Sequence, residues 1–211
     1  MKAMKNWFAW RGALPITAYL LALAAWLVLG AAHFGSDALA KAQGRLAEET
    51  MAVTDWQLVG LTQNEDGTLT TVDGDPQMIL ENVDGRVVRT ISYTAQFDGE
   101  AREMCLYYTT KVGEDYSADR RVFPQSVGEG RYIYTLPRTS LAALRLDPCS
   151  PEENKTVTLA VRGITLNAAD TLPAVWQYFV PTWYQAFCLV LYPALAAAAV
   201  SMIFAALKKE K

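Results

Sequence analysis

The sequence is poor in the groups that carry most enzyme chemistry. His33 is the only histidine among 211 residues and borders a long hydrophobic run, so histidine triads and histidine metal sites are excluded from the polar centre. The patterns GxSxG, CxxC, GxGxxG and GxxxxGK[ST] are absent, which removes the common routes to nucleophilic, redox and nucleotide chemistry. Paired carboxylates would still permit glycoside hydrolysis. We therefore expect a non-catalytic protein, with glycosidase activity as the enzymatic alternative.

Basic charge is also scarce in the centre of the chain. Residues 33–178 contain 21 acidic and 13 basic residues, a net charge of -8, whereas the two flanks contain six basic residues and one acidic residue. A surface that binds nucleic acid must neutralise phosphates with basic side chains. The sequence therefore predicts no nucleic-acid partner.

Two uncharged hydrophobic runs flank this centre, at residues 13–33 and 183–207. At about 1.5 Å per helical residue, each is long enough to cross the roughly 30 Å of bilayer hydrocarbon. Trp7 and Trp176 are placed to lie in the membrane interface. We predict two transmembrane helices in the lipid bilayer. A cleaved signal peptide is the alternative for the first, because a basic segment precedes it and residues 38–40 resemble a cleavage site.

The charge of the flanks predicts the orientation of these helices. Basic residues next to a membrane-spanning helix are retained on the cytoplasmic side, and both tails, 1–12 and 208–211, are basic. We therefore predict a cell (plasma) membrane location, with both termini cytoplasmic and residues 34–182 extracytoplasmic.

The segment between the helices is predicted to be mainly β. Ser36 can cap a juxtamembrane helical stalk over 34–53, and an interfacial linker is expected over 169–182. Between them, residues 54–168 contain short runs of β-branched and aromatic residues separated by Gly, Asp, Asn and Pro. This pattern is typical of a β-sandwich. The expected strands are 55–62, 68–72, 76–82, 86–97, 102–111, 120–124, 131–136, 141–147 and 155–166.

Alternation along these strands predicts which side chains form the core, because successive side chains point to opposite faces. In MCLYYT, for example, Leu106 points inward, whereas Cys105 and Tyr107 point away from the core. The predicted core residues are Trp56, Leu58, Ile91, Tyr93, Ala95, Phe97, Met104, Leu106, Tyr108, Tyr132, Tyr134, Leu136, Leu144, Leu146, Val157, Leu159 and Val161.

The order of these elements resembles a known family. A tryptophan strand is followed by DGTLTTVDGDPQMIL, a long strand into CLYYT, then GRYIYTLP, LAALRLDP and a closing TVTLAVRGITL. This pattern is similar to the galactose-binding-like β-sandwich of carbohydrate-binding modules and of ectodomains in bacterial envelope glycosyltransferase and polysaccharide-assembly membrane proteins. The resemblance covers about residues 54–166. It implies a jelly-roll-like antiparallel sandwich that binds glycan or supports an enzyme, and a partner such as a multi-pass envelope glycosyltransferase.

Sugar sites on such sandwiches stack an aromatic side chain on the pyranose ring and frame it with charged or amide groups. Tyr107 is the leading candidate because alternation turns it away from the core. Tyr116, Arg145 and Asp147 complete the predicted ligand-binding site. The alternative interpretation is structural, with Tyr107 covering the neighbouring strand and Arg145 paired with Asp147 or another acid.

Three smaller features leave alternatives open. Cys105 and Cys149 lie in the extracytoplasmic segment, where they form either a disulfide or two free thiols. The acid-rich turns 64–67 and 73–75 are either solvated or hold a structural calcium ion, and no other cofactor is expected. Asn154 begins a glycosylation acceptor pattern, which has meaning only in a eukaryotic secretory pathway.

Two functions from different classes follow. One is a membrane-anchored module that binds glycan or supports cell-envelope polysaccharide assembly. The other is a structural or sensory subunit of a membrane protein complex with no sugar binding. In the second case, the small-residue run at 194–199 would pack closely against a partner helix.

Overall fold

The computed structural model describes residues 12–209, which divide into two compact units. One unit comprises the described residues up to 38 and from 173 onward, with most of the first hydrophobic helix and all of the second, and the other comprises residues 39–172. Trp7 and the charged residues of tail 1–11 lie outside the described residues, as do residues 210–211.

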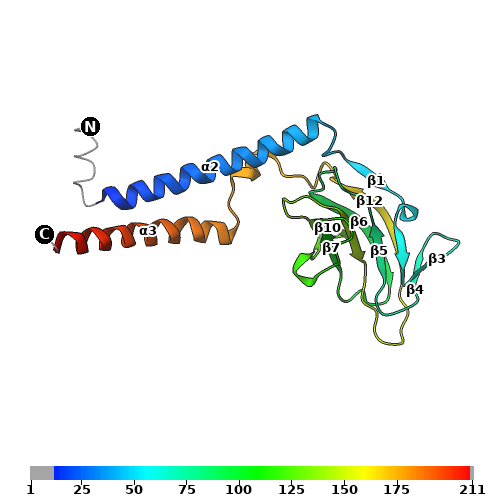
Figure 1. The fold of residues 1–211 in the computed structure, drawn as a ribbon. Helices are drawn as coiled ribbons and strands as arrows, with labels where there is room; N and C mark the ends of the chain where they lie inside the picture. Colours follow the sequence, from blue (N-terminus) through cyan, green and yellow to red (C-terminus); the bar gives the residue numbers. More distant parts are fainter. Residues whose placement is uncertain (1–11, 210–211) are drawn as a thin grey trace. The chain divides into compact units, whose positions relative to one another are not determined.

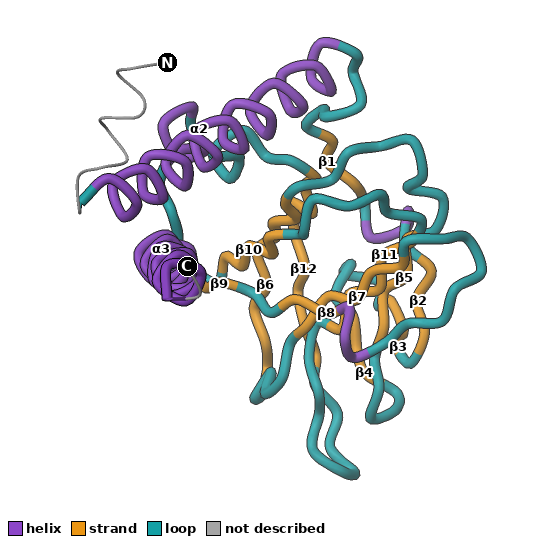
Figure 2. The backbone as a smooth tube through the Cα atoms, turned by 60° about the vertical axis from the view of Figure 1, so that its left-hand side comes forward, coloured by secondary structure: helices purple, strands orange, loops and turns teal. Residues whose placement is uncertain are grey.

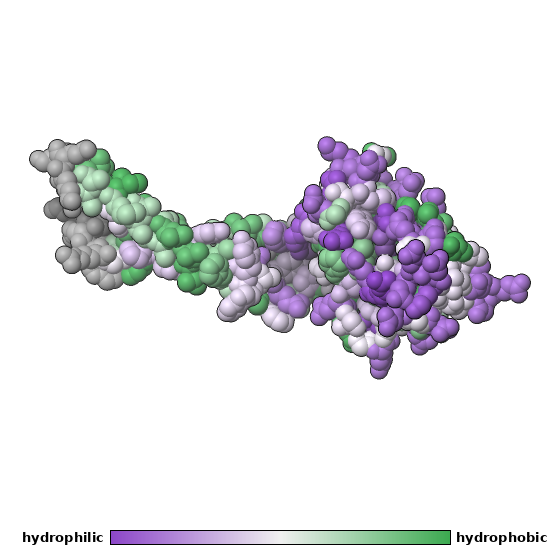
Figure 3. All heavy atoms as spheres, turned by 90° about the horizontal axis from the view of Figure 1, so that it is seen from below, coloured by the Kyte–Doolittle hydropathy of each residue, from purple (hydrophilic) through white to green (hydrophobic). Residues whose placement is uncertain are grey.

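The first unit is helical. Helix α2 spans Ala13–Ala42 and helix α3 spans Trp183–Lys209, with the short 3-10 helix η3 at Val175–Phe179 before it. Both long helices are long and apolar enough to cross a membrane, which is consistent with membrane anchoring. The space-filling view shows their surface as mainly hydrophobic, in contrast to the largely hydrophilic surface of the other unit (Figure 3).

Contacts within this unit hold η3 against α2. The hydroxyl of Tyr178 donates a hydrogen bond to Asp37 at 2.9 Å, and the indole N–H of Trp26 donates to the carbonyl of Phe179 at 3.2 Å. Gly30 permits this approach, because a Cβ there would lie 2.8 Å from the ring of Phe179. Within the predicted linker 169–182, η3 is therefore packed on the first helix.

The predicted helical stalk ends earlier than expected. The helix stops at Ala42, and Gly44 follows in a left-handed conformation (φ 70°) that closes the helix C-terminus. Residues 49–51, expected to be helical, instead form strand β1 (Glu49–Met51), which pairs with the last strand of the domain. The expectation of helix across 34–53 was wrong beyond Ala42, because a partner strand competes for this segment.

The second unit is a sandwich of two antiparallel sheets (Figures 1 and 2). This confirms the predicted mainly β domain flanked by two candidate transmembrane helices. The first sheet has the order β3 (Leu61–Gln63), β4 (Leu69–Thr71), β12 (Thr158–Leu166), β6 (Thr90–Asp98), β10 (Arg131–Thr135) and β9 (Gln125–Ser126), with β1 also on β12. The second has the order β2 (Gln57–Val59), β5 (Gln77–Leu80), β11 (Ala143–Asp147), β7 (Cys105–Thr109) and β8 (Arg121–Val122). Two 3-10 turns, η1 (Val53–Asp55) and η2 (Ala118–Arg120), complete it.

The predicted strand 55–62 is two strands in different sheets. Strand β2 belongs to the second sheet and β3 to the first, and Gly60 between them has φ 65°. A Cβ at Gly60 would lie 2.2 Å from a carboxylate oxygen of Asp73. Glycine therefore permits both the left-handed turn and the close approach of the 73–75 turn.

The strand expected at 86–97 starts at Thr90 rather than residue 86. The N–H of Arg86 donates to the carbonyl of Val83, and the N–H of Val87 donates to the carbonyl of Arg45, so this segment is a loop. Strand β9 (Gln125–Ser126) was not predicted, because two residues are too few to show alternation.

The core lies between the sheets and contains the residues that alternation predicts. Tyr93 and Tyr134 are fully buried, with their rings stacked at 6.0 Å and their hydroxyls 3.3 Å apart. Leu106 and Leu144 are also fully buried. Burying such a side chain contributes about 1.5–3 kcal/mol. Of the predicted core, Leu58, Phe97, Tyr108 and Tyr132 are only partly buried against it.

Candidate functional site

The outward face of the second sheet brings three predicted site residues together. In the β7–β11 pairing, Tyr107 lies opposite Arg145, and Cys105 lies opposite Asp147. Strand β8 adds Arg121 opposite Tyr107 on the other side of β7. Because alternation turns every second side chain outward, paired residues in this register share one face.

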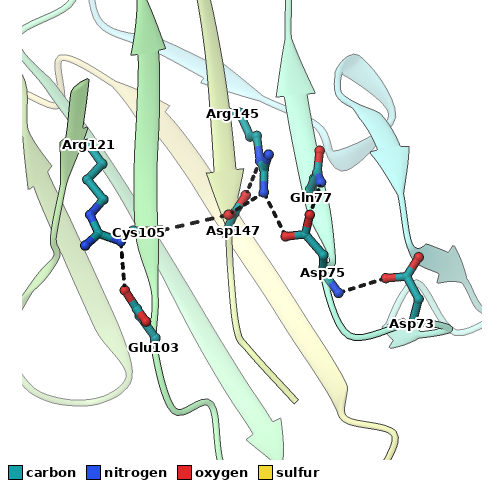
Figure 4. Close-up of polar contacts among 8 residues, drawn as sticks. All are labelled: Asp73, Asp75, Gln77, Glu103, Cys105, Arg121, Arg145 and Asp147. Carbon is teal, nitrogen blue, oxygen red and sulfur yellow. Dashed lines mark hydrogen bonds and ion pairs between the residues drawn. The ribbon is translucent and has the colours of Figure 1, made fainter. Parts of the chain in front are cut away.

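Arg145 is at the centre of this face (Figure 4). Its Nε donates to one oxygen of Asp147 at 2.8 Å, and its Nη2 donates to the other oxygen, also at 2.8 Å. The same Nη2 donates to Asp75 at 2.7 Å, and the guanidinium carbon lies 5.0 Å from the ring centroid of Tyr107. The bidentate pair with Asp147 holds the guanidinium in a fixed plane over the aromatic ring.

Asp75 reaches Arg145 because of the turn that carries it. The N–H of Asp75 donates to the carboxylate of Asp73 at 3.0 Å, and the second oxygen of Asp75 accepts a hydrogen bond from Gln77 at 2.6 Å. The carboxylates of this acid-rich turn thus accept hydrogen bonds from the protein. Within residues 12–209, no group of three or more His, Cys, Asp or Glu side chains is arranged to hold a metal ion.

Arg121 forms the other edge of the face. It pairs with Glu103 at 3.2 Å, and its guanidinium carbon lies 5.0 Å from the ring centroid of Phe123, which is 56% exposed. The neighbouring hydroxyl of Tyr107 raises the pKa of Arg121. Sequence reasoning did not assign Arg121, Glu103 or Phe123 to the site. Alternation in the predicted strand 120–124 places Arg121 and Phe123 on the same face. The sequence does not show, however, that this strand pairs with β7, and without that pairing the two residues cannot be assigned to the site.

A cavity of about 160 Å³ opens on this face. It is smaller than the 300–1,000 Å³ typical of pockets that enclose a small molecule. It therefore suits a substituent of a ligand lying across the face better than an enclosed substrate. Its lining comprises Gly74, Asp75, Glu103, Cys105, Tyr107, Arg121, Arg145, Asp147, Cys149 and Ser150.

Burial and pairing compete at the central ion pair. Burial raises the pKa of Asp147, and the hydrogen bond and charge of Arg145 only partly oppose this rise. Burial acts to lower the pKa of Arg145, but the hydrogen bond and charge of Asp147, joined by Asp75, outweigh it and raise that pKa. The face therefore presents a hydrogen-bonded network in which the burial of Asp147 and its pairing with Arg145 have opposite effects on the pKa of the carboxyl.

Tyr116, the fourth predicted residue, is not part of the cavity lining. Burial raises its pKa, and Glu81 and Asp147 add to the rise while Arg145 opposes it. Tyr116 is thus within electrostatic reach of Arg145 and Asp147, but it makes no described contact with the cavity.

The two cysteines of this unit are free thiols. Both are buried and both line the 160 Å³ cavity, although alternation predicted that Cys105 would point away from the core. The thiol of Cys105 lies 3.9 Å from a carboxylate oxygen of Asp147. Burial raises the pKa of Cys105 and raises that of Cys149 to about 11, so both thiols are protonated at neutral pH.

No protein-family model and no curated protein matches the chain. Among solved structures, it is similar to a low-affinity xylan-binding module, CBM86, from Roseburia intestinalis, with a TM-score of 0.37, 14% identity, and coverage of 57% of this chain and 94% of the module. It is also similar to a family two carbohydrate esterase from Cellvibrio japonicus, with a TM-score of 0.33, 14% identity and coverage of 61% and 36% of the two chains. A third is CsCBM6-3 from Clostridium stercorarium in complex with cellobiose, with a TM-score of 0.32, 8% identity and coverage of 55% and 93%. At these scores, the alignments carry no argument about function, which has to come from the residues of this chain.

Proposed function

We propose that the chain is a membrane-anchored, non-catalytic module that binds glycan on the outward face of its five-stranded sheet. One observation carries this proposal. Tyr107, a half-buried aromatic ring, is fixed next to Arg145, Asp147 and Asp75 at the mouth of a shallow cavity. A flat ring beside fixed donors and acceptors is the combination that recognises a pyranose ring and its hydroxyl groups.

Phe123 extends the aromatic surface at the edge of the same face. The guanidinium carbon of Arg121 lies 5.0 Å from the centroid of this ring, and Arg121 is also the cross-strand neighbour of Tyr107. Two aromatic rings along one face suit a chain of sugar units rather than a single monosaccharide. The substrate class we propose is therefore an oligosaccharide or polysaccharide.

The anchors set where binding takes place. With α2 and α3 in the plasma membrane and the sandwich on the extracytoplasmic side, the bound glycan would lie close to the membrane surface. The finer proposal, from the resemblance in the sequence, is support of cell-envelope polysaccharide assembly next to a multi-pass glycosyltransferase.

A second candidate is a structural or sensory subunit of a membrane complex. Two observations favour it. The Nε and Nη2 groups of Arg145 already donate to Asp147 and Asp75, as the structural interpretation of this pair expects. An apolar groove of about 650 Å³ also runs between α2 and α3, with Ala18, Ala22 and Ala196 in its lining. Small residues allow close helix packing in a membrane.

The full chain, purified in a detergent without a sugar headgroup, allows a direct test by glycan-array binding followed by calorimetry on the ligands found. The proposal expects binding that Tyr107→Ala lowers by about two- to tenfold, since stacking on one ring contributes about 0.5–1.5 kcal/mol. Tyr107→Phe keeps the ring and should retain most of the affinity.

Val127→Ala is the matched control, because Val127 is exposed on the loop between β9 and β10, in the other sheet. It should bind like the wild type. A folded wild-type chain that retains no glycan on the array would exclude the proposal and favour the structural subunit.

A further inference from the structure

The charged groups on the Tyr107 face differ in how far they reach into solvent. The two guanidiniums are the less exposed groups, with 18% of the Arg145 side chain and 35% of the Arg121 side chain exposed. The carboxylates of Asp75 and Glu103, at 66% and 56%, are more exposed and lie on opposite sides of the face (Figure 4). A ligand that approaches from solvent therefore meets carboxylates before it meets guanidiniums.

Each guanidinium on this face is also paired with an acid already. The Nε and Nη2 groups of Arg145 donate to both oxygens of Asp147, and Nη2 donates to Asp75 as well. The Nη1 group of Arg121 donates to Glu103 at 3.2 Å. An anionic sugar would therefore have to compete with carboxylates that are part of the fold.

The two exposed carboxylates, in contrast, retain the capacity to accept hydrogen bonds. Oε1 of Glu103 accepts from Arg121, and no described residue donates to its Oε2. Each oxygen of Asp75 accepts a single hydrogen bond, one from Arg145 and the other from Gln77. A carboxylate oxygen has two lone pairs, so both side chains can accept further donors. Both line the cavity of about 160 Å³, which thus offers open acceptors to a ligand.

The charge around the cavity has the same sign as these acceptors. Acidic side chains outnumber basic ones in the lining, with Asp75, Glu103 and Asp147 against Arg121 and Arg145. Residues 33–178 as a whole carry a net charge of -8. The summed field of such a surface concentrates cations and repels anions. The cavity and its domain therefore both favour a ligand with positive charge.

We propose that the glycan bound on the Tyr107 face carries free amino groups, as a deacetylated hexosamine polymer does. This inference rests on the glycan binding proposed above and names its substrate class. Tyr107 supplies the ring for stacking, and the ammonium of the sugar donates charge-assisted hydrogen bonds to Asp75 or Glu103. An N-acetyl group in its place carries no charge and loses this attraction. A carboxylate or sulfate group would meet like charge.

Calorimetric titration of the full chain, in a detergent without a sugar headgroup, tests the inference. The ligands are the tetramers of glucosamine and of N-acetylglucosamine, which share one backbone and differ in the amine. At about pH 6, amines of this kind are protonated. We expect the glucosamine tetramer to bind about three- to tenfold more tightly, since one exposed ion pair contributes only a few-fold and two carboxylates are present. Added salt should reduce this ratio.

A double variant assigns the preference to the two exposed carboxylates. Asp75→Asn with Glu103→Gln keeps an acceptor oxygen for each guanidinium but removes the charge, and should lower the ratio of the two affinities to about one. The ratio is the quantity compared, because it cancels any general loss of binding. The matched control, Glu65→Gln with Asp98→Asn, removes the same charge from exposed residues outside the cavity. It should keep the wild-type ratio.

Three results would overturn the inference. The first is equal binding of the two tetramers by the wild-type chain. The second is an equal loss of the ratio in both double variants, because the preference would then come from the general acidity of the domain. The third is competition by tetralysine as strong as that by the glucosamine tetramer, because the face would then bind any cationic chain.

The same titrations separate this inference from the glycan binding on which it rests. Tyr107→Ala should weaken the binding of both tetramers and keep most of their ratio, because the ring acts on both. A chain that binds the N-acetylglucosamine tetramer, or another glycan on the array, without preferring the amine keeps the proposed function and overturns only the amino-sugar inference. A folded chain that binds no glycan overturns both.

Discussion

The guanidinium carbon of Arg145 lies 5.0 Å from the ring centroid of Tyr107, its cross-strand neighbour in the β7–β11 pair. The contact joins the aromatic part of the candidate site to its charged part. Asp147, on the same strand two residues further on, holds the guanidinium by two hydrogen bonds. The orientation of the ring and the state of the ion pair are therefore coupled.

The ion pair should be more sensitive to losing one member than to losing both. Asp147 is only 8% exposed, so Arg145→Leu leaves a poorly solvated carboxylate and should cost about 2–3 kcal/mol of stability. The double variant Arg145→Leu and Asp147→Leu removes the charge as well and should cost less than the single variant. Thermal unfolding followed by circular dichroism measures both. A double variant that loses the full sum of the two single losses would contradict this coupling.

The titration of Asp147 provides a second test of the same pair. Burial raises its folded pKa above 3.8, so the fold favours the protonated form. This contribution to stability is full below pH 3.8 and is lost as the pH rises through the folded pKa. Arg145→Gln removes an opposing influence and should raise the pKa of Asp147 further. Carboxyl carbon chemical shifts of Asp-labelled protein follow this titration.

Asp170 is the internal control for that measurement. The hydrogen bonds from Arg131 lower the pKa of Asp170, so its contribution to stability is present above pH 3.8 and is lost as the pH falls through the folded pKa. Arg131→Gln should raise the pKa of Asp170 and leave that of Asp147 unchanged. If both carboxyls moved together, a general loss of structure would explain the result better than the two local pairs.

The thiols of Cys105 and Cys149 should resist alkylation in the folded chain. Both are buried and protonated at neutral pH, and only the thiolate is a strong nucleophile. At pH 7.5, we expect iodoacetamide to leave both unmodified for hours and to modify both once the domain is unfolded. Peptide mass spectrometry identifies the sites. Rapid modification of either thiol, or a peptide joining Cys105 to Cys149 under mild oxidation, would refute the free, inaccessible state.

Alternation predicted more of the site than might be expected from a single sequence. The strand period alone turned Tyr107 outward and placed Arg145 and Asp147 on one face, and the structure brings all three together. Asp75 and Arg121 required information that alternation does not contain, namely which strands pair and in which register. Cys105 was expected to point away from the core, and alternation does not show that neighbouring residues bury its side chain on that face.

Gly60 shows a second limit of sequence reasoning. The run from residue 55 to residue 62 has the composition of one strand, and only the left-handed φ of Gly60 divides it between two sheets. Glycine inside a strand pattern signals a bulge or a close approach, but it does not say which neighbour approaches. Here the neighbour is Asp73, which lies thirteen residues further along the chain in the turn that positions Asp75.

Substitution of Gly60 should therefore affect both stability and the candidate site. Gly60→Ala adds a Cβ at 2.2 Å from the Asp73 carboxylate and also strains the backbone. Gly67→Ala is the matched control, because Gly67 also has positive φ (83°) but has open space around its Cβ position. The control should cost about 1–2 kcal/mol from backbone strain alone, and Gly60→Ala should cost at least about 1 kcal/mol more. Equal losses of thermal stability would show that Asp73 moves away freely.

The predicted orientation can be tested by reporter fusions in a bacterial host. Basic residues next to the membrane favour the cytoplasm, so green fluorescent protein fused after Lys211 should fluoresce, whereas alkaline phosphatase at the same point should be inactive. Alkaline phosphatase fused after Leu172, before the second helix, should be active because only α2 then precedes it.

The intact mass of the protein tests whether the first helix is retained. A retained helix gives the full 23.3 kDa, whereas cleavage near residue 40 would remove most of α2 and leave the domain with a single anchor.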